Sequence, residues 1–269
     1  MSGWGKKLAE TWTNNVPPSR PSCSEICVYT SYLRRIQSAK KERIKLLVLG
    51  STPEFRDWGY EENLDITVVD KSEEYYQAIS REIRHKNIKE KLIISLWEDM
   101  ELEEEYDIII GDLAVGNIDG DRLDDFLKAV SSALLPGGYF IGKSFLWADD
   151  ELVKTPHMII EDYFKAPQMH PYTFINHQLG LYCLDKQTFQ IDFTRMFNEM
   201  IKLLKEGVLD QNTFSYFENV GWNTEMKFTF FAPSQDYFRE HVEKYMKFKE
   251  YVHTSDIYTC VFPIYIITK

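Results

Sequence analysis

The sequence predicts an α/β fold in which a doubly wound, mostly parallel sheet carries a helical N-terminal arm and an inserted lid. Residues 46–49 form a continuous apolar run, which is typical of a strand buried on both faces. Residues 66–70 form a second such run that ends on Asp70, 20 residues after Gly50. Strand-like and helix-like segments then alternate as far as residue 143, a pattern that favours right-handed crossovers and therefore a parallel sheet.

The elements of this region follow one another regularly. We expect strands at 44–49, 65–70, 91–95, 106–111 and 138–143, and helices at 54–60, 72–85 and 121–134. A Leu-Pro-Gly-Gly turn at 135–138 precedes the last of these strands, and glycine can take the positive φ that such a turn needs.

The rest of the chain flanks or interrupts this pattern. Three prolines between residues 17 and 21 oppose regular structure, and a helix is expected from Ser24. After residue 143 the alternation stops, and it returns with a strand at 227–231, a helix at 235–250 and a strand at 261–267. We therefore predict an arm and helix at 1–40, a core at 41–146 and 208–269, and an inserted, aromatic-rich lid at 147–207.

The turn after the first strand is the most informative segment. Ser51 and Glu54 have the spacing of a capping box, and Pro53 is tolerated in a first helical turn, so a tight strand-to-helix turn is expected. Asp70 ends the neighbouring strand, where a carboxylate can accept hydrogen bonds from ribose hydroxyls. The tight turn and Asp70 together predict a ribose-bearing cofactor.

The glycine content of the turn separates the candidate cofactors. A dinucleotide turn uses three glycines so that backbone N–H groups approach a pyrophosphate, whereas here only Gly50 is present and Pro53 has no N–H. S-adenosylmethionine carries no phosphate. The turn therefore favours S-adenosylmethionine over a nicotinamide dinucleotide.

Composition narrows the partners and the compartment. The 42 acidic and 31 basic residues give a net charge of −11, so no general attraction to nucleic acid or to an anionic membrane is expected. The four cysteines lack C-x-x-C spacing, and no long apolar run occurs, so we expect a cytoplasmic protein with neither a disulfide framework nor a structural metal. The oligomeric state does not follow from the sequence.

Taken together, these motifs resemble the class I S-adenosylmethionine-dependent methyltransferases over 41–146 and 208–269. The Gly-x-Thr-Pro-Glu turn, with an upstream Arg-Pro-Ser segment, is similar to that of a prokaryotic subgroup of the class. The resemblance implies a seven-stranded sheet whose last strand is antiparallel, with 227–231 and 261–267 as strands six and seven. It also implies that the methionyl group lies over Gly50, Ser51, Thr52 and Glu54, the ribose at Asp70, the adenine at Asp99 and Met100, and the reaction site at Asp112.

Each candidate residue also has a structural alternative. Asp70 is a ribose ligand or a strand-end residue, and Glu54 pairs with the cofactor ammonium or caps its helix. Arg20 binds the cofactor carboxylate or lies on the surface. Tyr29 covers the adenosine or belongs to the core. Asp112 is the candidate catalytic residue, and its alternative is a helix-capping carboxylate.

The lid adds two weaker sets of candidates. Its three histidines have no metal-binding spacing, and one of them could be a general base. Its aromatic side chains either wall an acceptor pocket or form a small core of their own.

The predicted function is methyl transfer from S-adenosylmethionine to an oxygen, nitrogen or carbon of a small-molecule acceptor, with S-adenosylhomocysteine as product. Val48 and the single glycine of the turn motivate an alternative, a non-catalytic regulatory or scaffold protein that binds the same cofactor. A nicotinamide-dependent reductase is the third possibility.

Overall fold

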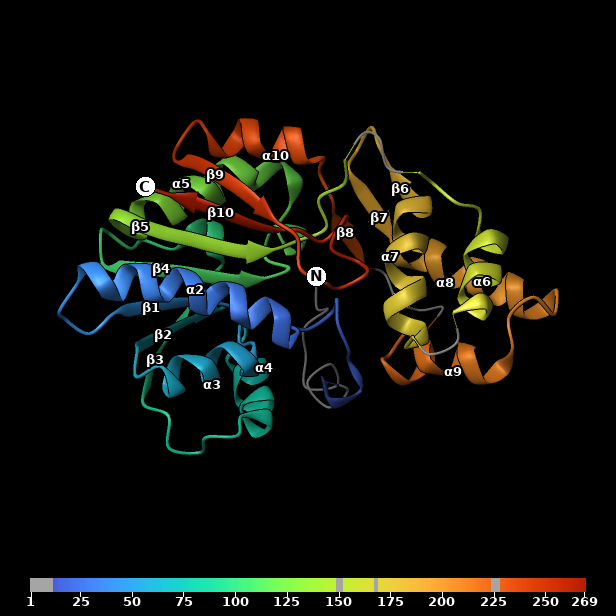
Figure 1. Ribbon diagram of the computed structural model, residues 1–269, viewed down its shortest axis with the longest axis horizontal. Coiled ribbons are helices and arrows are strands. Elements are labelled where there is room, and N and C mark those ends of the chain that lie inside the picture. Colours follow the sequence, from blue (N-terminus) through green and yellow to red (C-terminus); the bar gives the residue numbers. More distant parts are fainter. Residues whose placement is uncertain (1–11, 149–151, 167–168, 224–227) are drawn as a thin grey trace.

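The computed structural model describes residues 12–148, 152–166, 169–223 and 228–269. A seven-stranded sheet with the order β3-β2-β1-β4-β5-β10-β9 forms its centre (Figure 1). The strands are β1 (Lys45–Leu49), β2 (Asp65–Asp70), β3 (Glu90–Ile94), β4 (Tyr106–Asp112), β5 (Leu134–Lys143), β9 (Lys247–Val252) and β10 (Ile264–Thr268). Strands β1 to β5 pair in parallel, and β10 runs antiparallel to both β5 and β9.

Side chains of successive strand residues enter two different cores, as the two-residue period of a strand requires. In β1, Leu46 and Val48 pack with α2 (Cys23–Ala39) and α3 (Pro53–Glu61), whereas Leu47 and Leu49 pack with α5 (Leu123–Ala133). The helix α10 (Gln235–Val242) covers the same face as α5 (Figure 1). The predicted doubly wound sheet, buried on both faces, is confirmed.

The sixth strand is not the predicted one. Residues 247–252 form it as β9, and the predicted helix over 235–250 ends at Val242. The charged sequence of β9 resembles an exposed helix face, but β9 is an edge strand, where outward charges are usual. Likewise the helix expected at 72–85 is shorter: α4 spans Glu73–Ile79 and continues as one 3₁₀ turn, Ser80–Glu82.

The predicted strand at 227–231 belongs to a different sheet. Its described part, β8 (Thr229–Phe231), joins β6 (Leu184–Asp185) and β7 (Gln190–Asp192) in a three-stranded antiparallel sheet. This sheet lies with four helices in a layer beside the main sheet (Figure 1), namely α6 (Pro156–Lys165), α7 (Pro171–Cys183), α8 (Phe193–Lys205) and α9 (Gln211–Asn219).

The aromatic side chains of this layer pack on one another in one cluster. Phe197 stacks on Phe214 with ring centroids 5.4 Å apart, and Trp222 contacts both Phe193 and Phe217. Because α9 and β8 share the cluster with α7 and α8, we propose that the lid extends from about residue 147 to Phe231. No described helix combines the length and the apolar character needed to cross a bilayer.

Candidate functional site

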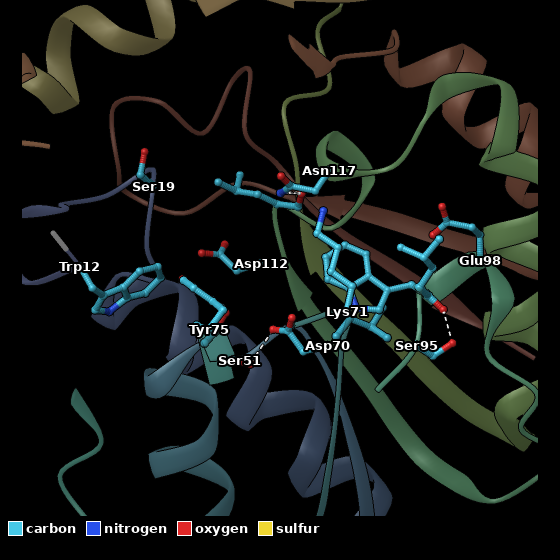
Figure 2. A pocket seen from close by; sticks show the side chains of 16 residues that line it. Trp12, Ser19, Ser51, Asp70, Lys71, Tyr75, Ser95, Glu98, Asp112 and Asn117 are labelled. Atoms are coloured by element: carbon cyan, nitrogen blue, oxygen red, sulfur yellow. Dashed lines mark hydrogen bonds between the residues drawn. The ribbon is translucent and has the colours of Figure 1, made fainter. Parts of the chain in front are cut away.

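A cavity lies over the carboxyl ends of β1, β2 and β4 (Figure 2). It encloses about 770 Å³ of space that no protein atom fills, and part of this space is open to solvent. Sixteen residues line it: Trp12, Ser19, Leu49, Gly50, Ser51, Thr52, Asp70, Lys71, Tyr75, Ser95, Leu96, Trp97, Glu98, Asp112, Leu113 and Asn117. Five of these residues, namely Gly50, Ser51, Thr52, Asp70 and Asp112, are predicted site residues.

Gly50 brings the backbone close to one wall of the cavity. Its φ of +86° lies in the left-handed region, and its N–H donates to Val69 O at 2.8 Å. Trp97 Nε1 donates to the same carbonyl at 2.9 Å, which fixes the indole beside the turn. A Cβ on Gly50 would lie 3.3 Å from Trp97 Cζ2, so only glycine leaves the turn and the indole in their present positions.

Asp70 forms the polar floor of the cavity. Ser51 Oγ donates to Asp70 Oδ2 at 2.5 Å, and the Ser72 N–H donates to Oδ1 at 3.0 Å. Burial of this carboxyl raises its pKa above the usual range. Each carboxylate oxygen can accept a further hydrogen bond, so Asp70 is anchored and still able to bind hydroxyl groups of a ligand.

The capping box predicted for Ser51 and Glu54 is wrong. The N-cap of α3 is Thr52, which makes no side-chain cap, because the Ser51 hydroxyl is bound to Asp70 instead. Pro53 does occupy the first turn, as predicted. The capping box of this region belongs to α2, where Ser22 and Glu25 bond each other's backbone N–H groups.

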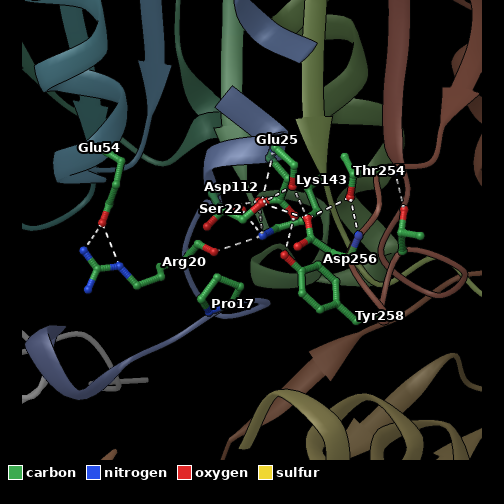
Figure 3. Close-up of polar contacts among 12 residues, drawn as sticks. Pro17, Arg20, Ser22, Glu25, Glu54, Asp112, Lys143, Thr254, Asp256 and Tyr258 are labelled. Atoms are coloured by element: carbon green, nitrogen blue, oxygen red, sulfur yellow. Dashed lines mark hydrogen bonds and ion pairs between the residues drawn. The ribbon is translucent and has the colours of Figure 1, made fainter. Parts of the chain in front are cut away.

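Glu54 makes an ion pair with the N-terminal arm. Arg20 Nε donates to Glu54 Oε1 at 2.8 Å, and a second guanidinium nitrogen contacts the same oxygen (Figure 3). Glu54 Oε2 is buried and has no hydrogen-bond partner among the described residues. Neither side chain lines the cavity as defined above, but Glu54 follows Thr52 in the turn by two residues and retains one free acceptor.

Aromatic side chains from separate elements line the cavity. Trp12, from the arm, packs against Tyr75 and Ile79 of α4. The arm itself is held to the lid, because Ser19 Oγ lies 2.8 Å from the Tyr172 hydroxyl. The core sheet and the arm thus bound the cavity, and the lid holds the arm in place.

Asp112 ends β4 and belongs to a buried charge cluster (Figure 3). Lys143 Nζ lies 3.2 Å from Asp112 Oδ1, outside hydrogen-bond geometry, and donates to Glu25 Oε2 at 2.9 Å. The Tyr258 hydroxyl donates to the other Glu25 oxygen at 3.1 Å. Burial raises the pKa of Asp112 to about 7; the Lys143 charge opposes this shift and the Glu25 charge adds to it.

The loop after Asp112 has an unusual backbone. Leu113 has a φ of +57°, which is uncommon for a residue with a side chain and occurs mostly where the surrounding structure enforces it. Asn117 Nδ2 donates to Leu113 O at 2.8 Å and thereby supports this conformation. Asn117 Oδ1 is buried without a hydrogen-bond partner in the described structure.

Solved structures share this architecture. No family model matches the sequence, and a search of curated proteins finds no significant match. An S-adenosylmethionine-dependent methyltransferase from Clostridium acetobutylicum superposes with a TM-score of 0.59 at 12% identity over 98% of each chain. Another from Methanosarcina mazei gives 0.50 at 10% identity, over 87% of this chain and 96% of that one. The chain has the class I methyltransferase fold.

A third similar structure carries a different name. A Rhodobacter sphaeroides chain named as a zinc-dependent alcohol dehydrogenase superposes with a TM-score of 0.57 at 14% identity over 98% of each chain. Within the described part of the chain, no three His, Cys, Asp or Glu side chains gather in a group that could hold a metal ion.

Besides Arg20 and Glu54, three further predicted cofactor residues lie outside the cavity of this methyltransferase fold. Asp99 is half exposed and pairs with Arg122 Nη2 at 2.6 Å, whereas the preceding residue, Glu98, lines the cavity. Met100 is buried in the core beside Leu47 and Leu49. Tyr29 packs on Phe55 with ring centroids 4.9 Å apart, so its core alternative describes its position.

The lid candidates do not reach the cavity either. His157 pairs with Glu206 at 3.0 Å. Burial lowers the pKa of His177 to about 4, and the Nδ1 atom of His177 lies 2.9 Å from Thr173 O. The lid aromatics pack in their own cluster, as their structural alternative predicted. Other lining residues, such as Trp12, Tyr75 and Asn117, have no local sequence signal, since only the fold brings them to this cavity.

Proposed function

We propose that this protein is an S-adenosylmethionine-dependent methyltransferase that acts on a small-molecule acceptor. The observation that carries the proposal is Asp70, a buried carboxylate that lines the cavity at the tip of β2 next to the Gly50 turn. In a doubly wound sheet this is where a ribose binds. The methyltransferase fold of the chain supports the same ligand.

The residues present fit this cofactor. Asp70 would accept hydrogen bonds from the ribose hydroxyls, and Glu98, with Leu96 and Trp97, would hold the adenine. Glu54 Oε2, a buried acceptor without a hydrogen-bond partner in the described part of the chain, would receive the α-ammonium, and Arg20 would bind the α-carboxylate. Gly50 leaves room for the chain of the ligand to cross the turn.

When bound, S-adenosylmethionine supplies an activated methyl group. The protein then has two tasks, which are to align the acceptor and to remove its proton where necessary. Asp112 is placed for the second task, because it lines the cavity and its raised pKa of about 7 suits proton transfer near neutral pH. Trp12 and Ser19 would limit the access of water from the side of the arm.

A small acceptor is favoured over a polymeric one. The net charge of −11 opposes the approach of nucleic acid, and the arm and the lid together restrict the space beside the cavity. The absence of the three-glycine turn argues against a pyrophosphate-bearing cofactor.

Calorimetry with S-adenosylhomocysteine and transfer of a deuterated methyl group to a cell extract test the proposal. Binding together with labelled product is the expected result. No binding at millimolar ligand would refute it. Binding without any labelled product would favour the regulatory or scaffold alternative, and quenching or enhancement of NADH fluorescence would favour the reductase.

A further inference from the structure

The buried cluster at the end of β4 carries more negative than positive charge. Glu25 and Asp112 contribute two carboxylates, and Lys143 contributes one ammonium. The side chains of Lys143, Glu25 and Asp112 are 1%, 2% and 4% exposed, so water contributes little to balancing them. A buried, uncompensated charge is costly, and the cluster therefore favours either a bound proton or a neighbouring cation.

Asp112 is the member of the cluster through which a ligand could supply that cation. It lines the cavity, whereas Glu25 is occupied by Lys143, by the Ser22 N–H and by Tyr258. The other charged residues of the cavity wall are Asp70, Glu98 and Lys71, which leave the wall as a whole negative. An anionic acceptor, such as a carboxylate or a phosphate ester, would be repelled.

Two oxygen acceptors at the same end of the cavity receive no hydrogen bond from the described residues. Asn117 Oδ1 is a buried acceptor without a hydrogen-bond partner among the described residues, and Asp112 Oδ1 has only the ion pair with Lys143 Nζ at 3.2 Å. Exchanging the Nδ2 and Oδ1 positions of the Asn117 amide would break the hydrogen bond that Nδ2 donates to Leu113 O at 2.8 Å. A ligand group that satisfies both oxygens must donate two hydrogen bonds, and leaving them unmet is costly.

We propose that Asp112 and Asn117 form an amine site and that the methyl acceptor is a primary or secondary amine. This inference rests on the proposed methyl transfer and adds the acceptor class to it. An amine nitrogen offers several N–H donors and, when protonated, the missing positive charge. A hydroxyl offers one donor and no charge.

The site also accounts for the protons of the reaction. An acceptor that arrives as an ammonium gives one proton to the Asp112 carboxylate, which frees the nitrogen lone pair. The nitrogen then forms a bond to the methyl carbon as the carbon–sulfur bond breaks, and the bonding electrons leave with sulfur as the neutral thioether. The methylated ammonium and the proton on Asp112 carry the two positive charges that the ammonium and the sulfonium brought.

Sinefungin provides a direct probe, because in this analogue a carbon that bears a primary amine replaces the sulfonium. We expect it to bind roughly 10-fold or more tightly than S-adenosylhomocysteine, and we expect Asp112→Asn to abolish this preference while leaving S-adenosylhomocysteine affinity nearly unchanged. Asn117→Leu should reduce the preference in part. Asp99→Asn, a matched carboxylate outside the cavity, should preserve it.

Two results would overturn the amine site. One is equal binding of the two analogues by the native protein, and the other is a sinefungin preference that survives Asp112→Asn. The position of a deuterated methyl group in products from a low-molecular-weight cell extract is the second measurement. Label on nitrogen supports the inference, whereas label on oxygen or carbon refutes it and leaves the proposed methyl transfer intact. Failure of S-adenosylhomocysteine to bind the native protein would instead refute the proposed function.

Discussion

Lys143 Nζ lies 3.2 Å from Asp112 Oδ1, and both side chains are almost completely buried where β4 and β5 end. Glu25, from the helix that follows the arm, is the second carboxylate on this ammonium at 2.9 Å. One lysine therefore holds together two core strands and the N-terminal helix. The arrangement leaves one negative charge in excess beside the cavity, and such a charge is costly for folding and useful for binding.

Asp112→Asn should stabilise the ligand-free protein at neutral pH. The pKa of Asp112 in the folded protein, about 7, lies above its ordinary value of 3.8, so the folded state binds this proton more tightly than the unfolded chain. The stability that this bound proton contributes is fully present below pH 4 and is lost as the pH rises through 7. Over this pH window we expect the free energy of unfolding of the native protein to fall relative to that of the variant. Denaturation curves from pH 4 to pH 8 that run parallel for the two proteins would contradict this.

Lys143→Met should have the opposite effect. It leaves Glu25 and Asp112 buried without their shared cation, and removal of one partner from a buried ion pair typically costs 3–5 kcal/mol. Urea denaturation at pH 7 measures the loss. Lys165→Met is the matched control, because Lys165 pairs with Glu161 at the surface and should change stability by less than about 1 kcal/mol.

Asp70→Ala should weaken the binding of S-adenosylhomocysteine by roughly 10- to 100-fold, because a charge-assisted hydrogen bond to a buried carboxylate contributes about 1.5–3 kcal/mol. Calorimetry provides the measurement. Ser51→Ala serves as the comparison, since it removes one of the donors to Asp70 and keeps the carboxylate. A native-like affinity in the Asp70 variant would remove the ribose assignment.

Gly50→Ala should impair both folding and binding. The alanine would have to keep the φ of +86° that Gly50 adopts, and its Cβ would lie 3.3 Å from Cζ2 of the Trp97 indole. The backbone strain costs roughly 1–2 kcal/mol, and the displaced indole narrows the cavity. Gly137→Ala is a suitable control, because Gly137 has a φ of +79° and no atom lies within 4 Å of its Cβ position. This variant should be less stable but should bind the ligand as the native protein does.

Glu54→Gln tests the assignment of the amino-acid end of the cofactor. The substitution removes the charge that would meet the α-ammonium and weakens the contact with Arg20. We expect roughly 10-fold weaker binding of S-adenosylhomocysteine and an unchanged affinity for 5′-methylthioadenosine, which lacks that end. Equal losses for both ligands would show that Glu54 acts through the fold of the turn.

Sequence patterns were sufficient to predict those features of the fold that depend on a single helix, strand or turn. The buried run before Gly50 and the position of Asp70 at the end of β2 follow from local composition and period, because a strand buried on both faces must be apolar throughout. The same patterns misplaced the sixth strand. An edge strand such as β9 is polar outside, so its sequence does not distinguish it from a helix surface.

By itself, the sequence determined the doubly wound core, the tight turn at Gly50 and the acidic tip at Asp70, since each depends on residues adjacent in the chain. Only the tertiary structure decided that Ser51 bonds Asp70, that Arg20 reaches Glu54, and that Lys143 joins Asp112 to Glu25. These contacts span 19 to 118 residues or join separate strands and helices. A buried charge finds its partner through packing in three dimensions, and no local spacing encodes that choice.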